Sequence, residues 1–337
     1  MTSRPFTYIL YPIAVFFSLI AYGQTIANDG IVASIHRYHQ NVGIRSVVPF
    51  DGRFLCLDED EKLFFVDANS SQIDSSINKY STDYYFEKLQ VINNVVVGTE
   101  GYQDKFRSYS LDLQKKKWKR YRFKKHIYPG TLIFQDDEYL ISNTCSGEWG
   151  GTIYFTNKKT SKIYESECTC AVNVIKCPDY YNVTASLLHG VGFTTIFNIR
   201  DPTKLKVHRN RIPLYLSDSL KAKGISIRES YSSKGVEKLI DTLEASCAGS
   251  FKFNNSILYI IEYRPFLHSS SVWIDSIKNN KLIRLYDLTK LGLSETGYDN
   301  FSYNQIVISP FDNTDFSGFI CMIYDKLELY IFDRQKK

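Results

Sequence analysis

A recurring hairpin constrains the fold of this chain more than any other feature of its sequence. Six segments alternate apolar and polar residues and then reach an Asp or Asn that opens a polar turn. The side chain of Asp or Asn accepts a hydrogen bond from the backbone two residues onward, which explains its place where a strand turns. The turn residues are Asp67, Asp112, Asn157, Asp201, Asp275 and Asp333.

The spacing of these hairpins indicates a repeated unit. Successive turn residues are 45, 45, 44, 74 and 58 positions apart. A second pair of apolar runs precedes each hairpin, such as IRSVVPF and RFLCLD before the first and TLIFQ and YLISNT before the third. Two hairpins in about 45 residues is the length of one four-stranded propeller blade. Aromatic residues make up 15% of the chain and favour strands.

On these repeats the chain resembles six-bladed β-propellers of the broad secreted bacterial kind. The resemblance covers residues 31–334 and rests on period and strand pattern, since no Trp-Asp or kelch motif recurs. It implies an all-β ring of six blades. It implies no single activity, because propellers host many.

The N-terminal and C-terminal repeats predict how the ring closes. The last repeat stops after its third strand, at Asp333, whereas the alternating segment IVASIHRY at 31–38 belongs to no repeat. An open last blade would expose an unpaired strand edge. We therefore expect the N-terminal segment to pair with the last blade.

The longest spacing, from Asp201 to Asp275, contains about thirty extra residues. A helical apolar pattern is formed there by Val236, Leu239, Ile240 and Leu243. The segment SDSLKAKG at 217–224 begins with a Ser that suits a helix cap and ends with Gly. These features predict a partly helical insertion at 212–245 on one face of the ring. A seventh, degenerate blade is the alternative.

The first 23 residues predict a cleavable signal peptide. Arg4 precedes an apolar run from Tyr8 to Tyr22, and Ala21 and Gly23 are the small residues that a cleavage site needs. An uncleaved anchor is the alternative, but a run of fifteen residues is shorter than the roughly 20 of a spanning helix. We expect residues 24–337 to form the propeller domain of a secreted or periplasmic protein without a membrane span.

Seven cysteines in an exported chain predict disulfide bonding, with at least one thiol left over. Their only cluster is Cys168, Cys170 and Cys177. A local disulfide from Cys177 to Cys168 or Cys170 is the prediction, and plain buried thiols are the alternative. The cluster lacks a fourth ligand and a nearby His, so we expect no metal site there.

The most basic stretch of the chain is LQKKKWKRYRFKKHIYP at 113–129. Its place in the repeat predicts the outermost strand of the second blade over residues 116–125, with Tyr121 and Phe123 packed on the neighbouring blade. Lysines on such an edge prevent the addition of other chains, which is the preferred interpretation. The alternative is a polyanion site, since cations interleaved with aromatic rings suit acidic polymers. Its candidate residues are Lys119, Arg120, Arg122 and Lys124.

Ligand sites of a propeller are expected in the loops over the central channel, where polar groups converge. The loop SGEWGG at 146–151 suits the exposure of Trp149 for stacking on a sugar or an apolar group, although a Trp that covers the ring core is the alternative. The acidic run at 58–61 lacks the spacing and glycine of a calcium loop and predicts a solvated turn. The candidate ligand-binding residues are Glu100, Tyr102, Glu148, Trp149, His189, Arg264 and His268.

The motif content favours binding over catalysis. The chain has no GxSxG, HExxH or P-loop motif, and its six histidines are scattered. The net charge of +5 is concentrated in the basic stretch, so no nucleic-acid partner is predicted. We expect a monomeric binding or scaffold propeller without a cofactor that recognises a protein or glycan of the cell envelope. The alternative is a carbohydrate-active hydrolase or lyase that uses Glu100 and Glu148 as its acid-base pair.

Overall fold

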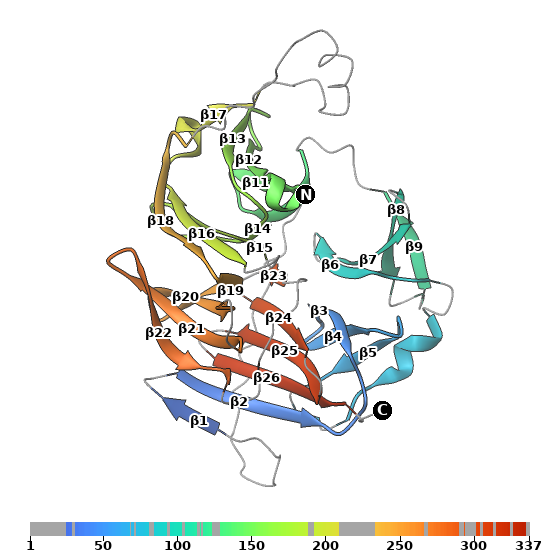
Figure 1. Ribbon diagram of the computed structural model, residues 1–337. Coiled ribbons are helices and arrows are strands. Elements are labelled where there is room, and N and C mark those ends of the chain that lie inside the picture. The colour runs from blue at the N-terminus through green and yellow to red at the C-terminus, as the bar shows by residue number, and fades with distance from the viewer. Residues whose placement is uncertain are drawn as a thin grey trace, which may run out of the picture.

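A computed structural model of the chain shows six β-sheets arranged around a ring (Figure 1). It describes residues 25–334 except 29–30, 68, 71, 81–83, 93–94, 103–104, 113–114, 116, 123–128, 188–191, 209–232, 266–268, 290–292, 294–300, 304–305, 313–314 and 324–325. The arrangement is a six-bladed β-propeller, which confirms the predicted fold class. The alternative of a seventh blade is wrong for this part of the chain, since its strands form six sheets.

The blades follow one another in chain order. Blade 1 contains β3 (Ile44–Phe50), β4 (Arg53–Asp58) and β5 (Leu63–Val66), followed by the 3-10 helix η1 (Ser75–Tyr80). Blade 2 contains β6 (Lys88–Ile92), β7 (Val95–Tyr102), β8 (Lys105–Asp112) and β9 (Lys117–Tyr121). Blade 3 contains β10 (Thr131–Gln135), β11 (Tyr139–Cys145), η2 (Gly147–Trp149), β12 (Gly151–Asn157), β13 (Ile163–Glu167) and the added strand β17 (Lys206–Val207).

The remaining blades complete the ring. Blade 4 contains β14 (Ala171–Lys176), β15 (Tyr181–Leu187), β16 (Phe193–Ile199), η3 (Pro202–Lys204) and β18 (Val236–Leu243). Blade 5 contains β19 (Ala245–Phe253), β20 (Ser256–Tyr263), β21 (Ser271–Lys278) and β22 (Lys281–Asp287). Blade 6 contains β23 (Phe301–Tyr303), β24 (Ile306–Asp312), β25 (Phe316–Ile323) and β26 (Lys326–Asp333), with β2 (Ile31–Tyr38) and β1 (Thr25–Asn28) outside β26.

The predicted turn chemistry is present in several blades. The Asp67 carboxylate accepts a hydrogen bond from the Asn69 backbone N–H at 2.8 Å, and Asp201 accepts one from the Thr203 N–H at 2.9 Å. Asp275 is an exception, because it lies inside β21, and that hairpin turns at Asn279 and Asn280 instead. Asn suits that turn because it tolerates positive φ, which is 53° and 56° at these two residues.

The apolar core is divided among the interfaces between neighbouring blades. Phe54 of blade 1 meets Phe319 of blade 6 edge-on, with 5.1 Å between ring centroids. Phe155 of blade 3 meets Tyr181 of blade 4 in the same way at 5.3 Å. The two rings of each pair come from different sheets, so their burial holds the blades together.

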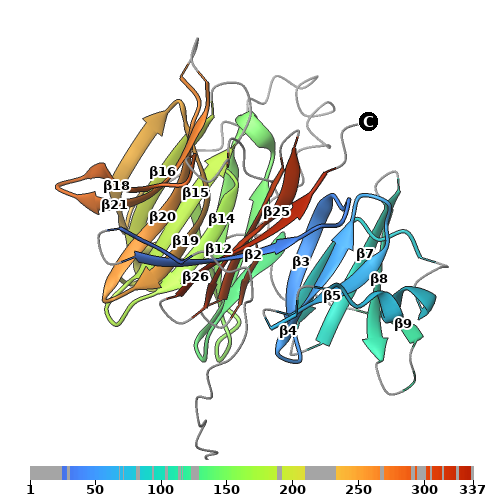
Figure 2. The same ribbon diagram turned by 90° about the horizontal axis from the view of Figure 1, so that it is seen from below.

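The N-terminal strand closes the ring, as predicted. β2 pairs with β26, with His36 opposite Tyr330 and Tyr38 opposite Phe332, and Figure 2 shows β2 beside β26 before the chain enters β3. The pairing is parallel, and β23 provides an innermost strand that the sequence pattern missed. β2 and β1 therefore extend a blade that already has four strands instead of supplying a missing one.

Blade 1 is the blade with the fewest described strands, and its outer edge is covered locally. The N–H and C=O of Phe65 exchange hydrogen bonds with Asp74 at 2.9 Å, and the Leu63 N–H donates to the Asn78 side chain. The segment that carries η1 thus covers part of the edge of β5, where a fourth strand would pair in other blades. Coverage of this kind protects an edge from pairing with other chains.

The prediction of a helix at Val236–Leu243 is wrong, because this segment is β18. β18 pairs with β16 along its length, and a register shift leaves Leu239 as an extra residue between Lys238 and Ile240. An extra residue reverses the strand's alternation at that point, and the resulting spacing imitates a helix. SDSLKAKG and the rest of the predicted insertion up to residue 232 lie outside the described residues, as does the predicted signal peptide at 1–23. Within the described ranges, no helix has the length and apolar character needed to cross a membrane.

The propeller has two faces. The loop face is the face at which β4, β7, β11, β15 and β20 end and the next strand of each blade begins. Backbone contacts join these loops to the connections that enter the blades: the Glu59 N–H donates to the Gly43 carbonyl, and the Glu244 N–H donates to the Gly192 carbonyl. The turn face is the opposite one and carries the tight hairpins such as Asp51–Gly52.

Candidate functional site

Backbone hydrogen bonds hold the loop between β11 and β12 in place on the loop face. η2 spans Gly147–Trp149, the Ser146 N–H donates to the Gly150 carbonyl at 2.9 Å, and the Cys168 N–H donates to the Gly151 carbonyl at 3.1 Å. A Cβ at Gly151 would lie 2.3 Å from the Thr144 carbonyl oxygen, so only glycine fits there. Glu148 is exposed at the tip, whereas the side chain of Trp149 lies outside the described part of the chain.

A disulfide fixes this loop to the connection between blades 3 and 4. It joins Cys145, at the end of β11, to Cys170, just before β14. The predicted disulfide from Cys177 to Cys168 or Cys170 is therefore wrong, since Cys168 and Cys177 are buried free thiols. The sequence pointed to the local cluster, but antiparallel pairing in blade 3 brings Cys145 to the loop face beside Cys170.

Glu100 lies at the loop-face end of blade 2. It is half-buried in β7, opposite Arg107 of β8, and its carboxylate accepts a hydrogen bond from the Tyr85 backbone N–H at 3.3 Å. Glu100 belongs to blade 2 and Glu148 to blade 3, so the predicted acid-base pair is divided between two blades. The hydrolase or lyase alternative stays a prediction from the sequence.

Arg264 has a structural partner. Its Nε donates to the carboxylate of Glu262, whose side chain is 0% exposed, and its backbone N–H donates to the Glu244 carbonyl at 2.9 Å. A buried carboxylate needs such a charged partner, because leaving it unpaired costs several kcal/mol, about 3 to 5. Arg264 therefore stabilises the structure of blade 5 through these contacts, independently of any ligand.

Three other predicted residues lie wholly or partly outside the described residues. His189 falls in the gap between β15 and β16, and His268 falls in the gap between β20 and β21. Tyr102 ends β7, but its side chain lies outside the described part. Each stays a prediction.

The basic stretch forms the outer strand of blade 2, as predicted, but over the shorter range of β9. Trp118 is the deeply buried residue of this strand, at 4% exposed, whereas Tyr121 is half-buried. Trp118 packs with Phe86 in the core between blades 1 and 2. The packing of Tyr121 on the neighbouring blade stays a prediction, and Phe123 and Lys124 lie outside the described residues.

The acidic run at 58–61 is a hairpin turn between β4 and β5. Asp58 is buried, and its Oδ1 accepts a hydrogen bond from the Lys62 N–H at 2.7 Å. Burial raises the pKa of Asp58 above its ordinary value. Among the residues that the structure describes, no group of three or more His, Cys, Asp or Glu side chains is placed to hold a metal ion.

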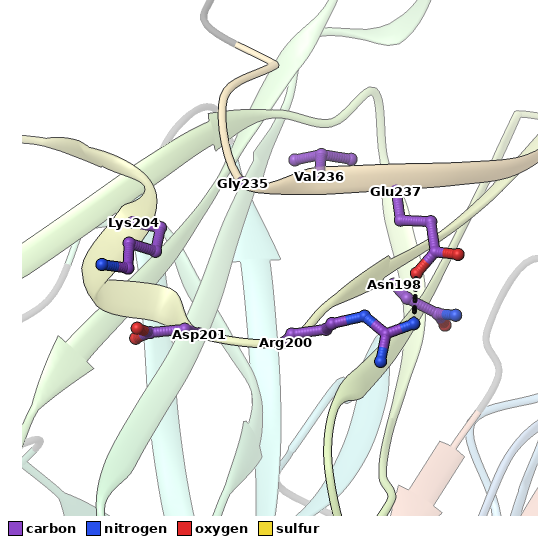
Figure 3. Close-up of a pocket in the computed structure, with 7 residues that line it drawn as sticks. All are labelled: Asn198, Arg200, Asp201, Lys204, Gly235, Val236 and Glu237. Atoms are coloured by element: carbon purple, nitrogen blue, oxygen red, sulfur yellow. Dashed lines mark hydrogen bonds and ion pairs between the residues drawn. The ribbon is translucent and has the colours of Figure 1, made fainter.

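A pocket of about 280 Å³ lies on the turn face of blade 4, between the segment that follows β16 and the start of β18 (Figure 3). Arg200 extends toward Glu237, with 3.0 Å between nitrogen and oxygen. The Asp201 carboxylate accepts a hydrogen bond from the Thr203 N–H and thereby stabilises the turn that follows β16. The principal charged groups of this pocket thus have partners within the protein.

The described attachment points of the insertion lie toward the face opposite the Trp149 loop. In blade 3, Gly151 lies at the loop-face end of β12, whereas β17 pairs with Tyr164 and Glu165 near the other end of the sheet. Because β17 leads into the insertion and β18 begins opposite Ile199, both attachment points lie toward the turn face.

One unusual buried carboxylate was missed as a site residue. Asp275 is 0% exposed, accepts a hydrogen bond from the Tyr263 hydroxyl, and has an Oδ1 without a partner in the described part of the chain. Arg284 lies over the Tyr263 ring at 4.2 Å. The sequence pattern assigned Asp275 to a turn, so its burial could be found only from the pairing of β20 with β21.

No protein-family model matches the chain, and no curated protein matches its sequence. Among solved structures it is similar to TolB from Acinetobacter baumannii, with 13% identity and a TM-score of 0.39 over 83% of this chain; it spans 62% of TolB, less than two thirds. It is also similar to the Pseudomonas brassicacearum lignostilbene dioxygenase, with 8% identity and a TM-score of 0.33 over 86% of this chain and 75% of the other. The Trypanosoma rangeli sialidase is similar at 7% identity and a TM-score of 0.34, over 93% and 59%. None of these likenesses extends to function.

Proposed function

We propose that this protein is an exported ligand-binding or scaffold propeller that recognises a protein or glycan of the cell envelope through its loop face. The observation that carries the proposal is the fastened loop between β11 and β12. A disulfide and backbone hydrogen bonds hold it while Glu148 stays exposed at its tip. A loop ordered before binding loses little conformational entropy on binding, which favours affinity.

Two further features support this proposal. Glu100 and Arg264, which the sequence predicts as ligand-binding residues, also lie at the loop face, in blades 2 and 5. A disulfide between Cys145 and Cys170 suits an oxidising compartment outside the cytoplasm. The described strands that flank the insertion, β17 and β18, attach it toward the turn face.

The experiment is capture of partners from an envelope fraction, together with a glycan array, using residues 24–337. Variants Glu148→Ala and Trp149→Ala alter the loop, and Asp179→Ala removes an exposed carboxylate from the turn face as the control. We expect Trp149→Ala to lower capture of the principal partner about tenfold, the loss typical of an aromatic anchor. Asp179→Ala should match the wild type.

A double variant tests the role of loop order. Cys145→Ser with Cys170→Ser frees the loop without changing Glu148 or Trp149, and it should weaken capture while the circular dichroism spectrum of the ring is kept. The proposal is wrong if all loop variants capture the same partners as the wild type, or if Asp179→Ala weakens capture equally.

A further inference from the structure

Three arginines gather at the loop-face end of the outer rim of blade 2. Arg107 follows the start of β8, Arg120 lies in β9, and Arg122 directly follows β9. Figure 1 shows β8 and β9 at the outer edge of the ring. All three are exposed, and within the described part of the chain none has a carboxylate within ion-pair distance. Among the described residues, the arginines that lie within 4.0 Å of a carboxylate are Arg37, Arg45, Arg53, Arg200, Arg264 and Arg334.

The strand register places two of these arginines on one face of the blade. Arg120 is opposite Tyr109, and Arg107 is two residues before Tyr109, so Arg107 and Arg120 share the face of the Tyr109 ring. Arg107 and Arg120 are diagonal neighbours across the two strands, and such positions lie about 7 to 8 Å apart. Two positive charges on one face of a sheet repel one another, and an anion bound between them removes this repulsion.

An aromatic platform supports this face. Phe86 packs against Trp118 with 4.4 Å between ring centroids, and Tyr84 stacks on Phe86 at 5.5 Å. Tyr84 also contacts Tyr109 at 4.8 Å, and the Arg120 guanidinium lies over the Tyr109 ring at 5.5 Å. Gly98 permits this packing, because a Cβ there would lie 2.6 Å from the Phe86 ring. The platform fixes the base from which the arginines project.

An exposed tyrosine is joined through its backbone to Glu100, the residue opposite Arg107. Tyr85 is 69% exposed, and its backbone N–H donates a hydrogen bond to the Glu100 carboxylate. In the strand register, Glu100 of β7 is the carboxylate opposite Arg107 of β8. An exposed aromatic ring beside guanidinium groups suits a sugar that carries an acidic group, because the ring stacks on the sugar and arginine binds the anion in two places.

We propose that Arg107, Arg120 and Arg122, with Tyr85, form a binding site for an acidic polysaccharide that carries sulfate or carboxylate groups. This site deepens the proposed function, because it assigns a class of ligand to the loop-face end of blade 2. It rests on the proposed function only in placing ligand recognition at the loop face. Lys119 is not part of the site. It projects from the opposite face of β9 and is 2.5 Å from the Asp112 carboxylate.

The experiment measures binding of defined polysaccharides to residues 24–337 by calorimetry. Heparin supplies sulfate and carboxylate groups, polygalacturonate supplies carboxylate groups alone, and dextran is the uncharged control. The double variant Arg107→Ala with Arg120→Ala removes two charges from the site. The matched control, Lys117→Ala with Lys119→Ala, removes two charges from the other face of the same strand.

We expect the arginine double variant to weaken binding of an acidic polysaccharide at least about tenfold, whereas the lysine double variant changes it less than about threefold. Tyr85→Ala should weaken it less than the arginine double variant, and dextran should not bind. Preference for heparin over polygalacturonate identifies sulfate as the recognised group, and the reverse preference identifies carboxylate.

The proposal is overturned if neither acidic polysaccharide binds, or if both double variants lose affinity equally, which would indicate general charge attraction. It is also overturned if poly-glutamate binds more tightly than either polysaccharide, because the partner would then be an acidic protein segment. These results are independent of the Trp149 loop. If Trp149→Ala captures envelope partners as well as the wild type, the proposed function is contradicted. The difference in polysaccharide affinity between the arginine and lysine double variants is not affected by that result.

Discussion

His36 lies ring on ring against Tyr330, with 4.7 Å between the ring centroids and 20° between the ring planes. Tyr38 and Phe332, the next pair on the same face, stack at 4.9 Å and 17°. Parallel pairing of β2 with β26 brings each pair into direct register. The seam of the ring is thus held by aromatic stacking in addition to backbone hydrogen bonds.

Truncation of Tyr38 should weaken this seam. Its side chain is fully buried, and its hydroxyl donates to the Asp67 carbonyl at 2.9 Å. We expect Tyr38→Ala to lower the free energy of unfolding by about 3 kcal/mol or more, and Tyr38→Phe by about 1 kcal/mol, because the latter loses only the hydrogen bond. Urea unfolding measures both. Arg37→Ala, at a half-exposed ion pair, is the control and should cost less than about 1 kcal/mol; a Tyr38→Ala value no larger than this would contradict the role of the stack.

Asp275 should make stability depend on pH. Burial raises its pKa to about 6, from about 3.9 in an unfolded chain. The folded state therefore binds the proton more tightly, so ionisation of Asp275 destabilises the fold as the pH rises from about 4 to above 6. Asp275→Asn removes this penalty. Its stability relative to the wild type should increase by about 2 to 3 kcal/mol between pH 4 and pH 7.5.

Urea unfolding at several pH values measures this difference. Asp179→Asn, at an exposed position, is the control and should follow the wild type across the whole range. Parallel stability curves for Asp275→Asn and the wild type would show that the buried carboxylate has an ordinary pKa.

Reduction of the Cys145–Cys170 disulfide should destabilise the protein. The bond closes a loop with a sequence separation of 25, which corresponds to about 3 kcal/mol through restriction of the unfolded chain. The wild type should melt at a lower temperature in a thiol reductant. The other described cysteines are buried free thiols, so the double variant Cys145→Ser with Cys170→Ser should melt at one temperature with or without reductant. A further shift of that variant on reduction would mean that another disulfide exists.

Gly98→Ala should disturb the platform beneath the arginines. The added Cβ would lie 2.6 Å from the Phe86 ring, so the ring or the strand must move. Overpacking of this kind costs about 1 to 3 kcal/mol. In a Phe86→Leu background, Gly98→Ala should lower the free energy of unfolding by less, because the smaller side chain leaves room for the added Cβ. The two substitutions should therefore show a coupling energy in a double-mutant cycle of urea unfolding. Strictly additive effects would mean that Phe86 does not occupy the space above Gly98.

Many of the blade strands could be predicted from the sequence because their causes are local. Alternation of apolar and polar residues decides which face of a strand is buried. The turns at Asp67, Asn157 and Asp201 form through hydrogen bonds to residues two or three positions away. The same reasoning failed at Asp275, where the actual turn residues, Asn279 and Asn280, lie a few positions later.

The candidate site could be predicted only in part. The fixed order of strands in a blade puts Glu100 and Glu148 on one face, so their loops were correctly grouped. The partner of Glu262, the disulfide partner of Cys170 and the exposed arginine row of blade 2 depend on residues from other strands. No local pattern contains that information.

The sequence by itself determined the repeat and the role of the N-terminal segment in closing the ring, because both depend on residue order along single strands. The choice of six blades over seven came from the sheet topology. Tertiary structure alone decided that β2 runs parallel to β26, that Leu239 interrupts the alternation of β18, and that Cys145 meets Cys170. The physical reason is that these features depend on the free energy of contacts between strands distant in sequence, which outweighs local preference.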